Sequence, residues 1–344
     1  MVGGRRFSVR NRHPAGPTTP GGQMSVPARL VAPALATATL LICAAAMPAQ
    51  SAGRPLPDRY VVSRAEGVLP EGIDVRPDGT MYVSSDGTGA LYRGRVTAPR
   101  LRPFRADGAT ARGSSRGIHT DRSGRVFSVG GGRLTVHAPD GRLLDAEDAP
   151  DGPLGAADLN DLVVTPDAVY VTDWANPVVL RAPLHGGKVG PLEPWADVRG
   201  AFPGFPAQYW LLNGIVADPA GRTLLVASNG TEAVWRIDTA TREVSRLDLG
   251  DTSFGADGMV LHDRTLYAVL NYGALHGVYI ARLDAQLRGG TVVHRVTGDR
   301  FDLPTTLARH DCRLYVVNSQ NDEPPGTPPY TVTALDDPEC RANG

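Results

Sequence analysis

The stretch Leu212-Asn213-Gly214-Ile215-Val216-Ala217 places a polar residue directly before an apolar run with the composition of a β-strand. The same pattern occurs again in Pro70–Val75, Ser115–Thr120, Leu159–Val164, Ala256–Leu261 and Pro304–Arg309. Each copy continues through a turn that contains Asp, Gly or Pro into a second strand-like run. Because these residues suit tight reversals, the repeats predict a series of β-hairpins.

The polar residues that open these runs recur at a nearly constant spacing. We call them the ring residues, and they are Glu71, Arg116, Asn160, Asn213, Asp257 and Thr305. Their separations of 45, 44, 53, 44 and 48 residues match the period of a four-stranded propeller blade. We therefore predict an all-β, six-bladed β-propeller with four antiparallel strands per blade over residues 54–344. Inner strands of a propeller begin at one mouth of the central channel, so the ring residues should meet there. A two-sheet sandwich built from similar hairpins is the alternative.

The segment Arg59–Arg64 precedes the first repeat and alternates as a strand does. We expect it to pair with Thr331–Leu335 as the outermost strand of the last blade. This pairing would remove the sheet edge that an open ring leaves exposed.

Residues 1–53 have the composition of an export region. Arg29 precedes the Ala- and Leu-rich run Leu30–Met47, and small residues follow it. A positive flank, an apolar core and a small-residue exit predict a secretory signal peptide. A retained membrane anchor is the alternative, although Pro33 interrupts the run. We therefore expect a secreted or cell-surface protein with no stable membrane insertion after cleavage.

Charge and cysteine content narrow the class of protein. The export region holds five arginines and no acidic residue, which leaves 30 basic and 36 acidic residues in the remainder. A mildly acidic chain without a basic tract argues against nucleic-acid binding. We expect a monomer that acts on a small molecule. Cys312 and Cys340 also remain, and an even number in an exported chain favours a disulfide over two free thiols.

Four of the ring residues carry oxygen ligands: Glu71, Asn160, Asn213 and Asp257. Two carboxylates and two amide carbonyls suit one divalent cation, first Ca²⁺, with Mg²⁺, Mn²⁺ or Zn²⁺ as alternatives. Without a cation, two carboxylates held close together would repel, and one would tend to take up a proton. The alternative is a set of polar side chains hydrogen-bonded around a water-filled channel.

The ring motifs resemble those of a known family. Pro70-Glu71-Gly72, Leu159-Asn160-Asp161, Leu212-Asn213-Gly214 and Ala256-Asp257-Gly258-Met259 resemble the senescence marker protein/gluconolactonase family, which includes regucalcin and bacterial lactonases. The resemblance implies that Glu71, Asn213 and Asp257 bind one divalent cation. It also implies that Asn160 lies beside the cation and contacts water or substrate, and that Asp257 is the general base.

This arrangement predicts a metal-dependent hydrolase that acts on a lactone or related ester. A cation can polarise a lactone carbonyl and acidify a bound water while a carboxylate takes the proton. The chain has no Gly-x-Ser-x-Gly elbow, which argues against a serine hydrolase. A non-catalytic extracellular binding propeller is one alternative. A strictosidine-synthase-like enzyme is another, but it would need a Glu in the last blades, and the sixth ring residue is Thr305.

Several residues at the same face are expected to line a substrate pocket. Sugar-lactone members of the family carry an Arg where this chain has Asp158. Arg116 would either supply a cation to the substrate instead or pair with a ring carboxylate. Trp174 and Tyr272 lie in loops that should wall the pocket.

The long connection Arg199–Trp210 contributes two further candidates, Phe202 and Phe205. They would either form a lid that favours an apolar or aryl substrate, or pack down between blades three and four.

Overall fold

The computed structural model describes residues 55–105, 113–272, 276–321 and 326–340. The chain divides into two units, residues 1–53 and 54–344, and every described residue belongs to the second. The predicted signal peptide therefore lies outside the described residues. In the part of the chain that is described, no helix has the length and apolarity to cross a membrane.

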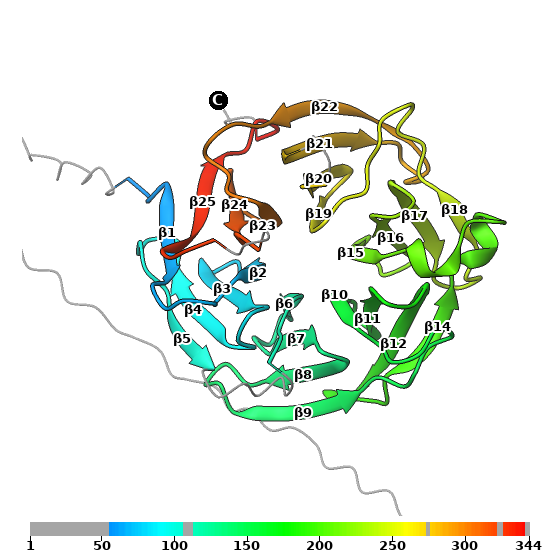
Figure 1. Ribbon diagram of the computed structural model, residues 1–344, viewed down its shortest axis with the longest axis horizontal. Helices are drawn as coiled ribbons and strands as arrows, with labels where there is room; N and C mark the ends of the chain where they lie inside the picture. The colour runs from blue at the N-terminus through cyan, green and yellow to red at the C-terminus, as the bar shows by residue number, and fades with distance from the viewer. Residues whose placement is uncertain (1–54, 106–112, 273–275, 322–325, 341–344) are drawn as a thin grey trace, which may run out of the picture. The chain divides into compact units, whose positions relative to one another are not determined.

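Six antiparallel sheets follow one another around a common axis, which confirms the predicted six-bladed propeller and excludes the sandwich (Figure 1). Blade one comprises β2 (Pro70–Val75), β3 (Thr80–Ser85), β4 (Leu91–Arg95) and β5 (Arg102–Arg105). Blade two comprises β6 (Ile118–Thr120), β7 (Val126–Gly130), β8 (Arg133–His137) and β9 (Leu143–Asp148). Blade three comprises β10 (Leu159–Val164), β11 (Ala168–Asp173), β12 (Val178–His185) and β14 (Glu193–Asp197), with the short β13 (Lys188–Val189) paired to β12.

The second half of the ring repeats this order. Blade four comprises β15 (Leu212–Ala217), β16 (Thr223–Ser228), β17 (Ala233–Asp238) and β18 (Val244–Arg246). Blade five comprises β19 (Met259–His262), β20 (Thr265–Leu270), β21 (Gly277–Leu283) and β22 (Gly290–Val296). Blade six comprises β23 (Pro304–His310), β24 (Arg313–Asn318), β25 (Tyr330–Asp336) and β1 (Arg59–Ser63). Two 3₁₀ turns, η1 (Arg199–Ala201) and η2 (Ala207–Tyr209), lie between blades three and four.

Aspartates at the predicted turns hold the inner hairpins together. The Asp78 carboxylate accepts a hydrogen bond from the backbone N–H of Thr80 at 2.9 Å. Asp218 accepts hydrogen bonds from the backbone N–H groups of Arg222 and Thr223, both at 2.6 Å. These side chains satisfy backbone donors that the tight turn leaves free, which explains why Asp recurs in these turns, although not at one fixed position.

The core lies between the blades. Each pair of neighbouring blades shares an apolar cluster, for example Tyr170, Leu224 and Trp235 between blades three and four. The second strands β11 and β16 are buried along their whole length because each is covered by a blade on both faces. This explains why they appear in the sequence as continuous apolar runs.

The N-terminal strand closes the ring as predicted. In the register of β1 and β25, Arg59 pairs with Thr333 and Tyr60 with Val332. The fully buried Tyr60 donates a hydrogen bond from Oη to the carbonyl of Val96, in blade one, at 2.7 Å. β1 therefore completes blade six and also binds it to blade one.

The predicted disulfide is present and secures the other end of the same blade. Cys312 lies in the turn between β23 and β24, Cys340 follows β25, and their Cα atoms are 5.3 Å apart. The bond anchors the C-terminal segment at the turn before β24.

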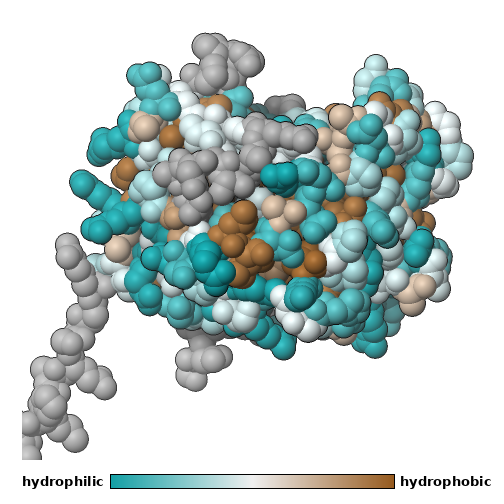
Figure 2. Space-filling model, turned by 90° about the horizontal axis from the view of Figure 1, so that it is seen from below, coloured by the Kyte–Doolittle hydropathy of each residue, from teal (hydrophilic) through white to brown (hydrophobic). Residues whose placement is uncertain are grey.

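One side of the propeller is shown in Figure 2, where hydrophilic side chains surround a smaller group of hydrophobic ones. The outermost strand of blade two, β9, lies on this side of the ring in Figure 1. Two of its leucines, Leu143 and Leu144, are exposed.

We predict that Tyr60→Ala lowers the free energy of unfolding by about 3–5 kcal/mol, because it removes a buried aromatic ring at the closure. Chemical denaturation of the variant and wild type measures the change. Leu56→Ala, at a side chain that is 37% exposed, is the control and should change it by less than about 0.5 kcal/mol. Equal effects of the two substitutions would contradict closure through Tyr60.

Candidate functional site

The six ring residues are held at one mouth of the propeller by their backbone carbonyls. Each carbonyl accepts a hydrogen bond from the preceding blade. Glycine N–H groups donate at three junctions, each at 2.8 Å: Gly117 to Asn160, Gly214 to Asp257 and Gly258 to Thr305. Hydroxyl groups donate at the other three: Thr305 to Glu71 at 2.8 Å, Thr172 to Asn213 at 2.7 Å, and Ser84 to Arg116. The convergence predicted from the repeat is therefore a property of the backbone.

A local irregularity in the inner strands accompanies these bonds. In blades one, three, four and six the register shifts at the ring residue, as between Leu212 and Ile215 of β15. In blades two and five the strand begins only after the ring residue. Such bulges redirect side chains and are common beside functional sites. Here they coincide with the residues that the sequence analysis selected.

Glycine follows the ring residue where neighbouring blades come closest. A Cβ on Gly214 would lie 2.2 Å from the carbonyl oxygen of Asp257, and one on Gly72 would lie 2.3 Å from that of Arg116. Neither contact is possible for a real side chain. The Asn-Gly and Glu-Gly pairs of the motif are therefore required by the junction between blades.

The predicted cation ligands are buried together at this mouth. Glu71, Asn213 and Asp257 expose 6%, 2% and 5% of their surface. The amide nitrogen of Asn271 donates to Oδ2 of Asp257 at 2.6 Å. The amide nitrogen of Asn213 donates to Oδ1 of Asn229 at 2.7 Å.

Burial changes the acidity of these carboxyl groups. It raises the pKa of Asp257 to about 7, although the hydrogen bond from Asn271 lowers it. Burial and the charge of Asp257 raise the pKa of Glu71 well above its usual value, and Arg116 partly offsets this. Burial also raises the pKa of Asp161, the neighbour of Asn160, to about 6. The mouth therefore holds carboxyl groups that are costly to ionise without a compensating cation.

Amide oxygens complete a set of potential cation ligands. The Oδ1 atoms of Asn160 and Asn271 are buried and have no hydrogen-bond partner among the described residues. Buried acceptors are normally satisfied, so these two atoms indicate a missing partner. Together with the carboxylates of Glu71 and Asp257 they provide the hard oxygen donors that Ca²⁺ or Mg²⁺ prefers. The residues present therefore fit a divalent cation.

The same residues fit a soft metal less well. Over the described ranges, no group of three or more His, Cys, Asp and Glu side chains is placed to hold a metal ion. A cation site here depends on amide oxygens beside two carboxylates. Such a donor set favours Ca²⁺ or Mg²⁺ over Zn²⁺, which takes nitrogen and sulfur more readily.

Arg116 pairs with aspartates outside the ring. Its Nε lies 3.0 Å from Oδ1 of Asp86, and its Nη1 lies 2.8 Å from Oδ1 of Asp158. One expected role of Arg116 was an ion pair with a ring carboxylate, Glu71 or Asp257. Arg116 instead forms ion pairs with Asp86 and Asp158, which lie outside the ring. Asp158, at the position where sugar lactonases carry an Arg, thus forms an ion pair with Arg116 of the neighbouring blade.

Two predicted pocket residues meet over the ring. Trp174, from the loop after β11, and Tyr272, from the loop after β20, stack with ring centroids 6.5 Å apart and planes 26° apart. Burial and the charges of Asp257 and Glu71 raise the pKa of Tyr272. The backbone N–H of Trp174 donates to the carbonyl of Asp158 at 2.8 Å. The structure therefore brings these two aromatic residues together with the ring.

Phe202 and Phe205 make their contacts elsewhere. They stack on each other with centroids 5.2 Å apart, and Phe205 contacts Trp210 edge-on at 5.8 Å. Phe202 remains 44% exposed and lies 6.3 Å from Trp235 of blade four. The preceding turn, η1, lies against the outermost strand β18 at the periphery of Figure 1. These contacts favour packing between blades three and four over a lid on the ring.

Three site residues were missed as ligands or partners in the sequence: Asp86, Asn229 and Asn271. Each directly follows the second strand of its blade and contacts a ring residue. Aligning the repeats on the end of the second strand, rather than only on the start of the first, would have found them.

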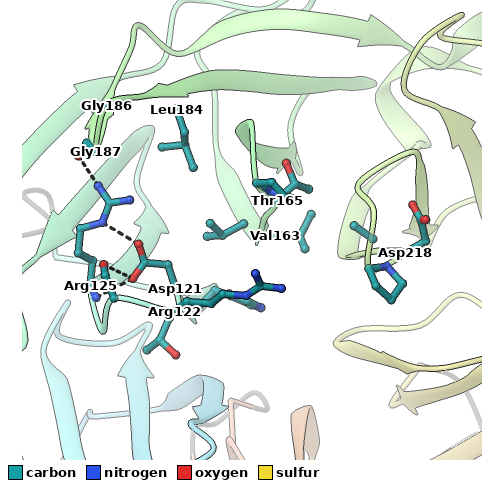
Figure 3. Close-up of a pocket in the computed structure, with 16 residues that line it drawn as sticks. Asp121, Arg122, Arg125, Val163, Thr165, Leu184, Gly186, Gly187 and Asp218 are labelled. Carbon is teal, nitrogen blue, oxygen red and sulfur yellow. Dashed lines mark hydrogen bonds and ion pairs between the residues drawn. The ribbon is translucent and has the colours of Figure 1, made fainter. Parts of the chain in front are cut away.

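A separate cleft of about 750 Å³ lies at the opposite ends of β6, β10 and β15. Its walls include Val163, Leu184 and Asp218 (Figure 3). Asp121 and Arg125 pair there at 2.7 Å. The cleft shares no residue with the predicted site.

Comparison with known proteins gives matches in structure but not in sequence. No family model matches the chain, and no curated protein matches it. Virginiamycin B lyase from Staphylococcus aureus is similar with a TM-score of 0.53 at 11% identity, over 81% of this chain and 87% of that one. Regucalcin from Agrobacterium tumefaciens, described as a calcium-binding protein, has a TM-score of 0.55 at 16% identity, over 82% and 94%.

The allergen Mala s 1 of Malassezia sympodialis has a TM-score of 0.60 at 15% identity, over 84% of this chain and 99% of that one. At such identities the likeness shows the fold alone. Regucalcin-like and lyase propellers are thus structural neighbours, and membership of the gluconolactonase family stays a prediction.

We predict that Gly214→Ala destabilises the protein by about 1–3 kcal/mol, because its Cβ would collide with the Asp257 carbonyl. Gly200→Ala is the matched control, since no atom lies within 4 Å of the Cβ added there. Thermal unfolding of both variants checks the difference. An unchanged midpoint for Gly214→Ala would show that the junction tolerates a wider separation.

We also predict a pH dependence of stability that originates at Asp257. A carboxyl group whose folded pKa is raised from 3.8 to about 7 favours folding in its protonated form, so stability falls as pH rises through this window. Three pKa units correspond to about 4 kcal/mol at most. With a chelator present to remove divalent cations, we compare the unfolding free energies of Asp257→Asn and wild type. The value for the variant minus the value for wild type should rise between pH 5 and pH 8. A constant difference across this range would contradict the shift.

Proposed function

We propose that this protein is an exported, metal-dependent hydrolase that opens a lactone or a related ester at the channel mouth. The observation that carries the proposal is the buried group of Glu71, Asp257, Asn213 and Asn160, with its raised carboxyl pKa values and unpartnered amide oxygen. Such a group is costly to maintain unless a ligand uses it.

Each residue has a distinct role in this proposal. Glu71, Asp257 and the amide oxygens would hold a divalent cation, which when bound would polarise the lactone carbonyl and acidify a water molecule. Asp257, oriented by the hydrogen bond from Asn271, accepts the proton of the attacking water. Asn160 contacts the water or the substrate through its free carbonyl oxygen. Water adds to the carbonyl carbon, the ring C–O bond breaks, and Asp257 returns its proton to the departing ring oxygen, so the product is a hydroxy acid.

A non-catalytic binding propeller that uses the same face is the second candidate. The stacked pair Trp174 and Tyr272 supports it, because aromatic walls serve binding as well as catalysis. A strictosidine-synthase-like reaction has less support. Thr305 is 1% exposed and donates its hydroxyl to the carbonyl of Glu71, so the sixth ring position offers no carboxylate.

The test is hydrolysis of a panel of aliphatic, aryl and sugar lactones, measured with Ca²⁺ and after complete removal of cations by chelation. We expect activity only with the cation, and a loss of about 10²–10⁴-fold in Asp257→Asn. Asp263→Asn is the control, because that side chain is 88% exposed and lies in the turn at the opposite end of blade five.

Thermal shift with Ca²⁺ separates the two candidates. A cation-dependent shift without hydrolysis of any lactone would favour the binding propeller. Activity that survives complete cation removal would contradict the metal-dependent mechanism.

A further inference from the structure

The channel mouth carries more negative charge than a divalent cation offsets. The charges of Asp257, Asp161 and Asp86 all act on Glu71, and Arg116 opposes them. Asp158 is the second ion-pair partner of Arg116. We call these five carboxylates, Glu71, Asp86, Asp158, Asp161 and Asp257, the acidic mouth. Once a bound divalent cation keeps Glu71 and Asp257 ionised, that cation and Arg116 supply three positive charges against five negative ones.

Arg116 is already paired with carboxylates at two of its three guanidinium nitrogens, Nε and Nη1. Both of its ion pairs have short contacts, 3.0 Å to Asp86 and 2.8 Å to Asp158. The Ser114 hydroxyl also donates to Asp86 at 2.6 Å, which fixes that carboxylate in place. A carboxylate or phosphate on a ligand would therefore meet a guanidinium whose charge two aspartates already offset, and it would face the remaining negative charge.

An aromatic pair lies beside some of these carboxylates: the backbone N–H of Trp174 donates to the carbonyl of Asp158 at 2.8 Å, and the charges of Asp257 and Glu71 act on Tyr272. Trp174 and Tyr272 come from blades three and five, which are not adjacent, and their rings stack 6.5 Å apart. Tyr272 is 46% exposed, so part of its ring is open to a ligand. Aromatic faces attract organic cations, and nearby negative charge strengthens the attraction.

Two buried acceptors add an independent sign of a ligand. Asn160 exposes only 6% of its surface, and its Oδ1 has no hydrogen-bond partner within the described ranges. Oδ1 of Asn271 also has no hydrogen-bond partner within the described ranges, although the amide nitrogen of Asn271 donates to Asp257. Any of these acceptors that a metal leaves free is suited to an N–H or O–H donor of a ligand.

We propose that the acidic mouth recognises an organic cation, an alkylammonium group attached to an aromatic or apolar body. This deepens the proposed function, because it assigns the substrate to the class of positively charged lactones or esters. Recognition of the cation does not itself require that the protein be a hydrolase. A neutral sugar lactone and an anionic lactone would both be disfavoured relative to the cationic one.

Binding is tested with three phenols that differ in charge and little in size: 3-(trimethylammonio)phenol, 3-tert-butylphenol and 3-hydroxybenzoate. Calorimetry on the full chain, with and without Ca²⁺, should give at least about tenfold tighter binding of the cation than of its neutral isostere. Its affinity should fall as salt rises, since the side chains of Asp86 and Asp158 are partly exposed. No detectable binding is expected for the benzoate.

Two variants test whether the preference for the cationic phenol arises at the acidic mouth and its aromatic pair. Asp86→Asn should weaken binding of the cationic phenol about 3- to 10-fold while leaving the neutral one unchanged. Trp174→Leu should weaken the cationic phenol about 2- to 5-fold more than the neutral one. Asp263→Asn, at the opposite end of blade five, should change neither. Equal binding of the cationic and neutral phenols, tighter binding of the benzoate, or no binding of any phenol would overturn the proposal.

The acetate esters of the same phenols separate this proposal from the proposed function. The values of kcat/KM, each divided by the rate of hydroxide-catalysed hydrolysis of that ester, should be highest for the cationic ester. Preferential binding of the cationic phenol without hydrolysis would retain the ligand class and reject the hydrolase. Hydrolysis of all three esters without charge preference would retain the hydrolase and reject the ligand class.

Discussion

A single hydrogen bond at each junction between blades, accepted by the carbonyl of a ring residue, fixes where the six inner strands begin. Three of the donors are glycine N–H groups, and a Cβ on any of these glycines would collide with the next blade: with the carbonyl of Asp257 at Gly214, with Asp161 at Gly117 and with Thr306 at Gly258. The remaining donors are hydroxyls of Thr305, Thr172 and Ser84. Because the contact uses only the carbonyl of the ring residue, it sets the position of the side chain without restricting its chemistry. The same junction can therefore present a carboxylate, an amide or a guanidinium to the channel.

Because the backbone makes the junction and leaves the side chain available, polar side chains can be buried at the mouth of an otherwise apolar ring. Burying two carboxylates close together is unfavourable, and the protein compensates only in part, through Asn271 at Asp257 and the more distant Arg116. Leucines with positive φ, Leu69 at 44° and Leu211 at 51°, stand two residues before ring residues and add backbone strain at the same place. Strain and unpaired acceptors that gather at one mouth are what a ligand site is expected to contain.

The fold and the ring were predictable because both depend on regular spacing. The blade period and the polar residue before each apolar run are visible in the sequence, and the closing strand Arg59–Ser63 follows from the need to cover an edge. The partners were harder to predict because they depend on side-chain reach. Arg116 reaches Asp86 and Asp158, and no sequence signal distinguishes these from Glu71. The role of Phe202 was ambiguous for a similar reason, since an aromatic residue in a long connection packs toward whichever blade lies beneath it.

The two ends of the inner strands differ in how their charges are arranged, and this difference indicates which end faces a ligand. At the far end, Asp121 and Arg125 neutralise each other, and Asp218 is occupied by backbone N–H groups of its own turn. At the ring, carboxylates outnumber the guanidinium, and their charges act on one another through a poorly solvated interior. A cleft with one dominant sign of charge and walls of low polarity focuses its field outward. Burial is the largest cause of the raised pKa of Glu71, and the neighbouring carboxylates that add to it are the ones that would attract a positively charged partner.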